Sequence, residues 1–400
     1  MRCMIFSAQL CAERWKHEQV FYFPICAALL TGCQQVPGEI ERHPVISFSV
    51  TEVPVHSAAV PSPSVFQDPL QERLDGMTLQ QKVGQLFFAR FPQDNDALEE
   101  IETFQPAGYI LFGVNFENSN PETLKATLEK CQSVSEIPLL FGVDEEGGTV
   151  VRASKYSTFR SEPFASPQKL YQQGGLQRIA EDAEEKSRFL KELGFTVNLA
   201  PVSDVSTDPQ DFIYARSFGQ PAEQTAEYVS TVVKAMQKTG VSPVLKHFPG
   251  YGNNVDTHTG SAVDDRSYEQ FLVSDFLPFQ AGIEAGAPAI LISHNIVRCM
   301  DEQYPASLSK KAHDILREDL GFEGIIMTDD LAMDAVSSYS GSKSSAVLAV
   351  LAGNDLLISS DLPSQYKSVL EAVEQGEISQ QMLDRAVLRV LRWKESLGLL

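Results

Sequence analysis

Residues 242–258 have the sequence SPVLKHFPGYGNNVDTH, in which a short apolar segment leads directly into a polar, glycine-containing loop. Residues 242–245 are apolar enough to predict a buried strand. Asp256 and His258 are two residues apart, so in an extended segment their side chains point the same way. A carboxylate beside an imidazole fixes its tautomer and raises its proton affinity, which suits a general acid near neutral pH. A solvated loop histidine is the alternative, but the polar groups clustered after this strand favour a functional site.

Seven more segments resemble residues 242–245 in length and apolar character, as expected for strands buried on both faces of a parallel sheet. They are residues 84–89, 108–112, 139–143, 196–199, 289–293, 324–327 and 355–358. Amphipathic helices are expected between them, for example from Pro121, from Pro221 to Gly240, and over 379–397. Eight β-then-α repeats predict an α/β fold, a single-domain (β/α)8 TIM-type barrel, over an open doubly wound sheet. A seven-strand or locally irregular barrel remains an alternative.

Polar residues occur beside most of the predicted strands. They are Asp144, Asn198, Asp204, Lys246, His247, His294, Thr328, Asp329, Asp330 and Asp355. Because the carboxyl ends of barrel strands meet at one mouth, these side chains are expected to converge on a single site.

The overall composition restricts the class of partner. The chain has 32 basic and 53 acidic residues, a formal net charge of −21, and 43% hydrophobic residues. This charge argues against nucleic acid or an anionic membrane surface as partner. Cys131 and Cys299, the two cysteines beyond the N-terminal region, have no metal-type spacing, so neither a metal nor another cofactor is expected.

The N-terminal region predicts export. Residues 20–30 are apolar but too short for a comfortable membrane span, and they lead into Leu30-Thr31-Gly32-Cys33, which resembles a bacterial lipobox. We therefore expect a signal peptide over 1–33 and a lipid anchor at Cys33 on the bacterial cell surface, with an unrelated apolar stretch as the alternative. Residues 34–66 are rich in proline and predict a flexible tether. Residues 67–400 are expected to form the catalytic barrel.

Five motifs together resemble glycoside hydrolase family 3, in particular its single-domain β-N-acetylglucosaminidases, over about residues 74–397. The motifs are Asp144-Glu145-Glu146-Gly147-Gly148 with Arg152, Asn198-Leu199-Ala200-Pro201-Val202 with Asp204, Ala215-Arg216-Ser217-Phe218, the run from Lys246 to His258, and Gly324-Ile325-Ile326-Met327-Thr328-Asp329-Asp330-Leu331. Tyr251 and Thr149 depart from the family pattern, where many members have His and Arg.

The resemblance implies roles for individual residues. Asp329 matches the catalytic nucleophile, His258 the general acid/base, and Asp256 its orienting partner. The positions that bind the sugar hydroxyls and acetamido group match Asp144, Arg152, Arg216, Lys246 and His247. The implied activity is that of a retaining β-N-acetylhexosaminidase, with terminal β-linked N-acetylglucosamine of cell-wall or chitin-type oligosaccharides as its small carbohydrate substrate.

Other interpretations stay open at this point. The protein could be a β-glucosidase-type or phosphorolytic member of the family, or an inactive glycan-binding surface lipoprotein. Asp330 could be a helix cap, His294 a packing residue, and Arg216 a structural ion-pair partner. The sequence predicts no oligomeric state.

Overall fold

The computed structural model describes residues 68–93, 97–252, 262–333, 336, 339 and 343–400. Its main sheet has eight strands in the order β10-β1-β2-β3-β4-β5-β7-β9, and every pairing is parallel. A parallel bridge between Met327 and Leu356 joins the two edge strands, so the barrel is nearly closed. The predicted (β/α)8 TIM-type fold is confirmed. The strands are β1 (Phe87–Arg90), β2 (Gly108–Leu111), β3 (Leu140–Val143), β4 (Val197–Asn198), β5 (Ser242–Phe248), β7 (Ala289–Ile292), β9 (Ile325–Thr328) and β10 (Leu357–Ser359).

All eight predicted strands exist, and their ends differ from the prediction by at most two residues except at two boundaries, which differ by three. β1 begins at Phe87 because the preceding residues form a short helix, α2 (Leu79–Gly84), which Thr78 and Gln81 begin with a reciprocal capping box. β5 continues to Phe248, so Lys246 and His247 lie within the strand and not after it.

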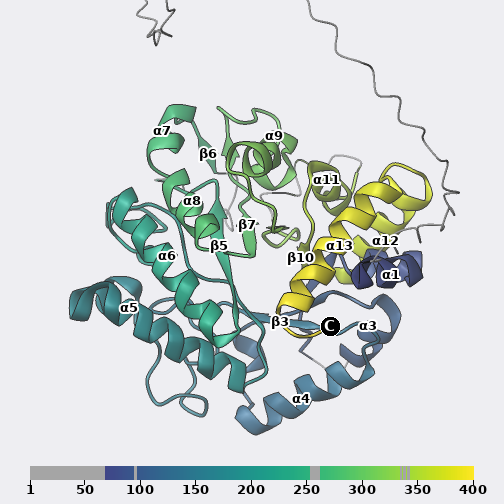
Figure 1. Ribbon diagram of the computed structural model, residues 1–400, viewed down its shortest axis with the longest axis horizontal. Coiled ribbons are helices and arrows are strands. Elements are labelled where there is room, and N and C mark those ends of the chain that lie inside the picture. The colour runs from purple at the N-terminus through teal and green to yellow at the C-terminus, as the bar shows by residue number, and fades with distance from the viewer. Residues whose placement is uncertain (1–67, 94–96, 253–261, 334–335, 337–338, 340–342) are drawn as a thin grey trace, which may run out of the picture. The chain divides into compact units, whose positions relative to one another are not determined.

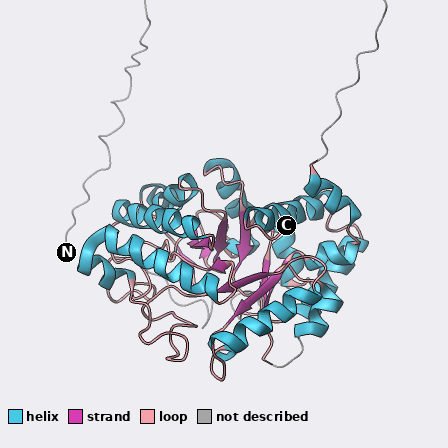
Figure 2. Cartoon of the chain, turned by 60° about the horizontal axis from the view of Figure 1, so that its bottom comes forward, coloured by secondary structure: helices cyan, strands magenta, loops and turns pink. Residues whose placement is uncertain are grey.

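Helices surround the central strands, as Figure 2 shows. They are α1 (Pro69–Gly76), α3 (Ala97–Phe104), α4 (Pro121–Val134), α5 (Pro167–Glu192), α6 (Ala222–Thr239), α7 (Tyr268–Val273), α8 (Phe276–Glu284), α9 (Lys310–Asp314), α11 (Ser345–Ala352), α12 (Leu362–Glu374) and α13 (Gln380–Ser396). In Figure 1, α5, α6 and α8 lie along one side of the barrel and α12 and α13 along another. A short parallel pair, β6 (Val263–Asp264) and β8 (Ile296–Val297), lies outside the main sheet.

The predicted helix ends follow from capping chemistry. Asn120 caps α4, and its Oδ1 accepts a hydrogen bond from the backbone N–H of Thr123 at 2.9 Å. α6 ends at Gly240, which has a left-handed backbone (φ 80°), and Ser379 caps α13. The three helices predicted from Pro121, Pro221 and residue 379 are therefore confirmed.

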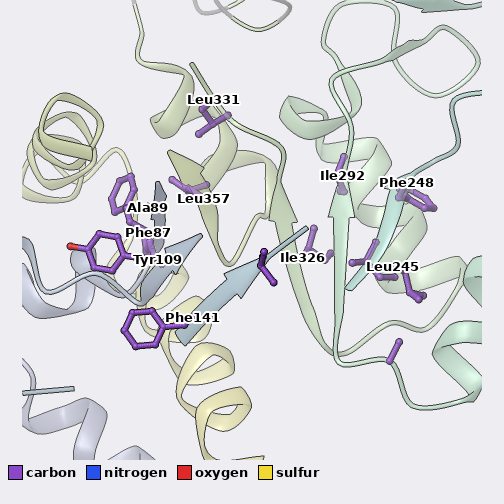
Figure 3. Close-up of a cluster of buried hydrophobic side chains, with 14 of the residues drawn as sticks. Phe87, Ala89, Tyr109, Phe141, Leu245, Phe248, Ile292, Ile326, Leu331 and Leu357 are labelled. Atoms are coloured by element: carbon purple, nitrogen blue, oxygen red, sulfur yellow. The ribbon is translucent and has the colours of Figure 1, made fainter. Parts of the chain in front are cut away.

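Strand residues alternate between two hydrophobic cores. Odd-numbered Phe87, Tyr109 and Phe141 belong to the outer core between strands and helices, shown in Figure 3. The inner core fills the barrel and contains Phe88, Ile110, Leu140, Val197, Val244, Leu291, Met327 and Ile358. Trp393 of α13 belongs to this inner cluster, and its indole N–H donates to Ser242 Oγ at 2.9 Å at the amino end of β5. The barrel interior is thus packed at its amino end.

Asp355 does not lie with the other polar residues at the mouth of the barrel, so the predicted convergence is wrong for this residue. It precedes β10 and therefore lies at the amino end of the strand, away from the mouth. Its carboxylate binds Arg317 at 2.6 Å and Arg389 at 2.9 Å, and accepts the N–H of Ile326. Asp355 is a structural residue that ties the barrel to the helices after β7 and β10.

The predicted signal peptide, lipobox and tether lie outside the described residues, so these assignments remain predictions. Within the part of the chain that the structure describes, no helix has the length and apolar character needed to span a membrane.

Candidate active site

A cavity of about 450 Å³ opens at the carboxyl ends of the strands. Side chains two residues apart in a strand point to the same face. Several residues that line the cavity therefore lie two positions after residues that face the interior of the barrel. Phe88 is followed by Arg90, Ile110 by Phe112, Gly142 by Asp144, Val244 by Lys246 and Met327 by Asp329. The full lining is Arg90, Ile110, Phe112, Asp144, Val150, Arg152, Leu199, Phe212, Arg216, Lys246, His247, Leu291, Asp329, Asp330, Met333 and Ile358.

Lys246 is the centre of the charged part of this cavity. Its Nζ lies 2.6 Å from Asp144 Oδ1 and 2.6 Å from Glu146 Oε1. The register between β5 and β7 shifts between Lys246 and Phe248, and such an irregularity re-aims side chains at the end of a strand. This explains how the consecutive residues Lys246 and His247 both reach the cavity.

Glu146 holds a second cation, Arg216, through two hydrogen bonds of 3.0 and 2.7 Å. Burial would raise the pKa of Glu146, but the charges of Lys246 and Arg216 outweigh it and lower that pKa well below its usual range. Burial would likewise lower the pKa of Arg216, and Glu146 reverses the shift and raises it. The ion pairs therefore stay charged in the barrel mouth.

His247 continues this network. Its Nδ1 lies 2.8 Å from Asp204 Oδ2, and its Nε2 lies 3.2 Å from the Arg216 guanidinium. Because a guanidinium only donates, Nε2 must accept, which places the imidazole proton on Nδ1 facing Asp204. The Asp204 carboxylate also accepts the backbone N–H of His247 and of Tyr251.

Arg152 is positioned by its neighbour in the same motif, Glu145. The buried Glu145 carboxylate accepts the backbone N–H groups of Arg152 at 3.0 Å and Ala153 at 2.9 Å, and bonds the Ser154 hydroxyl. The Nε of Arg152 is buried and has no hydrogen-bond partner among the described residues. A buried donor without a partner, next to a cavity, is suited to a ligand acceptor.

Asp329 and its neighbours differ in role. Asp329 follows the inward Met327 and lines the cavity. Asp330 accepts the N–H groups of Ala332 and Ser360 and the Ser360 hydroxyl, so it stabilises the loop after β9. His294 bonds Ser307 Oγ at 2.7 Å and the Asp330 carbonyl at 3.0 Å. These contacts support the structural interpretation of Asp330 and His294.

The structure brings together six of the predicted site residues: Asp144, Arg152, Arg216, Lys246, His247 and Asp329. Asp256 and His258 lie outside the described residues. Arg216 is both an ion-pair partner and a lining residue, so the two interpretations of it are not exclusive. Tyr251 is buried and its ring packs edge-on against His247 at 5.1 Å.

Sequence reasoning missed three functional candidates, Glu146, Arg90 and Phe112. The guanidinium carbon of Arg90 lies 4.7 Å from the centre of the Phe112 ring. Arg90 lies two residues after the inward-facing Phe88 of β1. Phe112 lies two residues after the inward-facing Ile110 of β2, so the alternation of side chains along a strand could have identified both. Within the described ranges no group of three or more His, Cys, Asp or Glu side chains could hold a metal ion.

Comparison with known proteins identifies the family. Residues 78–393 match the model of the glycosyl hydrolase family 3 N-terminal domain. The chain belongs to glycoside hydrolase family 3. It is therefore a glycosidase with a carbohydrate substrate, and the charged cavity lies where a barrel of this type binds its ligand.

Three relatives are informative. A β-hexosaminidase, LpqI of Mycobacterium tuberculosis, is 30% identical over 269 residues, which are 64% of this chain and 68% of LpqI. The structure of a family 3 β-N-acetylglucosaminidase from Paenibacillus sp. superposes with a TM-score of 0.76 at 31% identity, covering 81% of this chain but only 63% of that one. A β-N-acetylhexosaminidase from Beutenbergia cavernae gives a TM-score of 0.72 at 27% identity, with 80% and 99% covered.

Proposed function

We propose that this glycosidase is a retaining β-N-acetylhexosaminidase that removes terminal β-linked N-acetylglucosamine from cell-wall or chitin-type oligosaccharides. The supporting observation is that Asp329 shares one cavity with a buried charged cluster, Asp144–Lys246–Glu146–Arg216–His247. A carboxylate nucleophile beside fixed polar groups is the arrangement that a retaining glycosidase needs. The names of the relatives favour an N-acetylated sugar over plain glucose.

The charged cluster would bind the sugar. Asp144 accepts hydrogen bonds from sugar hydroxyls, while Lys246 and Arg152 donate hydrogen bonds to hydroxyl or acetamido oxygens. Glu146 and Asp204 lie behind these groups and hold Lys246, Arg216 and His247 in place. The sugar thus enters a site whose side chains are already oriented, which lowers the entropy cost of binding.

Two displacements complete the reaction. In the first, an Asp329 oxygen attacks the anomeric carbon as the glycosidic bond breaks, and His258 gives its proton to the leaving oxygen. In the second, His258 takes a proton from water, whose oxygen attacks the anomeric carbon and breaks the bond to Asp329. Asp256 would hold the imidazole in the tautomer that this exchange requires.

The experiment compares turnover of an aryl N-acetyl-β-glucosaminide and an aryl β-glucoside by the full-length protein. We expect selective cleavage of the N-acetylated sugar with release of the β-anomer first, measured by proton NMR. Preference for the glucoside would contradict the proposal, as would first release of the α-anomer. A rate that depends on added phosphate, with formation of a sugar 1-phosphate, would indicate phosphorolysis in place of hydrolysis. No turnover of either substrate would favour a glycan-binding protein.

We also propose that the protein is exported and lipid-anchored at Cys33, on the basis of the lipobox-like Leu30-Thr31-Gly32-Cys33. In cells, Cys33→Ala should leave an unprocessed chain that fails to incorporate a fatty-acid label. Equal labelling of the wild type and Cys33→Ala would contradict this assignment.

A further inference from the structure

Lys186 of α5 is a buried lysine beside the charged cluster, and its side chain is only 10% exposed. Its ammonium lies 3.1 Å from Asp182 Oδ2, one helical turn earlier. It donates a hydrogen bond to the backbone carbonyl of Glu146 at 3.1 Å, and it lies 5.2 Å from the centre of the Phe164 ring. A carboxylate, a carbonyl and an aromatic ring therefore hold this ammonium in one position.

The carbonyl that Lys186 binds belongs to a tight turn after β3. The backbone N–H groups of Glu146 and Gly147 both donate to the Val150 carbonyl, at 3.0 and 3.1 Å. Gly147 has φ 99°, and a Cβ there would collide with the Ala165 carbonyl oxygen and lie 3.5 Å from Lys186 Nζ. This turn therefore lies directly against the segment before α5 and against the Lys186 ammonium, in a conformation that favours glycine.

The side chain of Glu146 gives this backbone contact its consequence. Its Oε1 lies 2.6 Å from Lys246 Nζ and 2.7 Å from Arg216 Nη2. The carboxylate is only 2% exposed, so its position depends closely on that of the backbone to which it is attached. Because Lys186 binds this backbone, a displacement of the Lys186 ammonium would move both cations that line the cavity.

The chemistry of the Asp182–Lys186 pair points beyond packing. The Asp182 side chain is 5% exposed, so both charges are largely removed from water. Burying two charges is costly, and apolar side chains of similar volume often replace such a pair at no cost in stability. A charged hydrogen bond to one carbonyl, in contrast, fixes one geometry. A binding site needs fixed geometry because its ligand-binding groups depend on the residues that support them.

We propose that Lys186 is a positioning residue for sugar binding, because its ammonium fixes the Glu146 backbone. Through the Glu146 carboxylate it sets the positions of Lys246 and Arg216 in the cavity. This inference rests on the proposed function, in which the charged cluster binds the sugar. Lys186 does not line the cavity and acts only through the residues that do.

The first test measures KM and kcat of the full-length Lys186→Met variant with the aryl N-acetyl-β-glucosaminide. Methionine keeps most of the length of the side chain and removes the ammonium. KM should rise about tenfold, because a misplacement of about 1 Å in a site can cost about 100-fold. A loss confined to binding raises KM and leaves kcat nearly unchanged, so kcat should fall by less than about threefold. The Kd for N-acetylglucosamine, measured by calorimetry, should rise by the same factor as KM.

A double variant separates positioning from stability. Lys186→Met alone leaves Asp182 as a buried charge without its partner, which destabilises the fold. Lys186→Met/Asp182→Leu removes that charge, and both side chains line a small cavity that gives the larger leucine room. Its urea unfolding should return toward the wild-type value while KM stays raised. Recovery of stability and KM together would overturn the proposal. The double variant also replaces the single one if Lys186→Met does not fold.

A double-mutant cycle tests whether Lys186 acts through Glu146. Glu146→Gln should raise KM by itself, and the addition of Lys186→Met should raise it by less than about a further threefold, because residues that act through one another are not additive. Multiplication of the two separate effects would show that Lys186 acts independently of Glu146. That result would overturn the proposal, as would an unchanged KM in Lys186→Met.

Two other lysines provide matched controls. Lys191 is on the same helix and also donates to a backbone carbonyl, that of Thr239 at the end of α6, at 3.0 Å. Lys394 is buried, and it donates to Gln85 Oε1 at 2.6 Å near the amino end of β1. Lys191→Met and Lys394→Met should both keep the wild-type KM. A rise in either control as large as that in Lys186→Met would overturn a specific role of the Glu146 contact.

These measurements distinguish failure of this inference from failure of the proposed function. If the wild type prefers the aryl β-glucoside, the proposed function fails, and the same KM comparisons made with the glucoside still test Lys186. If the wild type cleaves the N-acetylated sugar and Lys186→Met binds it normally, only the positioning role fails. If the wild type neither cleaves nor binds either sugar, both fail.

Discussion

Lys246 Nζ and Glu146 Oε1 lie 2.6 Å apart, and each side chain is only 2% exposed. The pair lies beneath the mouth of the barrel, and Glu146 also binds Arg216 at 2.7 Å. One buried carboxylate thus binds two cations that line the cavity. This leaves Asp144, which is more exposed and also bound to Lys246, able to accept a hydrogen bond from a substrate.

Replacing Glu146 by Gln should affect both stability and binding. Removing one partner of a buried ion pair leaves uncompensated charge and costs about 3–5 kcal/mol in the free energy of unfolding. Urea unfolding should show this loss, and KM for the N-acetylglucosaminide should rise because Lys246 and Arg216 lose their fixed positions. The control Glu371→Gln removes an exposed pair with Lys367 and should change stability by less than about 1 kcal/mol. Equal stability and KM in wild type and Glu146→Gln would refute the account of this cluster.

Asp275 should make stability depend on pH. Burial raises its pKa, the charge of Arg266 opposes this rise, and the charges of Asp204 and Asp264 add to it, so that the pKa is about 6. The folded protein therefore binds this proton more tightly than the unfolded chain, so stability falls as pH rises from about 4 to about 7. Relative to Asp275→Asn, which cannot ionise, the wild type should lose about 2–3 kcal/mol over that range.

Denaturant unfolding of both proteins at pH 4, 5.5 and 7 measures this difference. A wild type that gains stability over the variant as pH rises would show that the pKa of Asp275 is lowered in the fold, not raised.

Asp355→Asn should destabilise the protein without changing substrate recognition. Asp355 is buried at the amino end of the barrel and binds both Arg317 and Arg389, so we expect a loss of about 3–5 kcal/mol in the free energy of unfolding. KM should stay at the wild-type value at a temperature where the variant is folded, because the cavity lies at the other end. A raised KM in this variant would place Asp355 at the active site after all.

Arg90→Gln should show the reverse pattern. Arg90 is exposed, lines the cavity on β1 and makes no ion pair with the part of the chain that the structure describes. Stability should change little. Loss of one hydrogen bond to the substrate costs about 0.5–1.5 kcal/mol, so KM for a chitin-type oligosaccharide should rise about two- to tenfold. An unchanged KM would mean that Arg90 does not contact this substrate.

Much of the architecture was predictable because buried parallel strands leave short apolar segments in the sequence. The error at Asp355 came from treating a residue that begins a strand like one that ends it, although the two lie at opposite ends of the barrel. β5 was predicted too short because the polar side chains of Lys246 and His247 do not resemble a strand interior. They are tolerated there because each meets a carboxylate, Asp144 or Asp204.

The candidate site was predicted less completely than the fold. Asp144, Lys246 and Asp329 were identified through family motifs, and their convergence follows from strand direction. Glu146 and Arg216 lie 70 residues apart in the sequence. Their ion pair forms only when the chain folds, so no local sequence pattern could have predicted it.

The central claim is that Asp329 is the nucleophile in this cavity. The most direct test is to incubate the protein with 5-fluoro-N-acetylglucosaminyl fluoride, which forms a slowly hydrolysed glycosyl-enzyme, and to locate the label by peptide mass spectrometry. We predict a single labelled peptide with the sugar on Asp329 and no labelling of Asp329→Asn. A sugar attached to another carboxylate, or equal labelling of Asp329→Asn, would contradict the account.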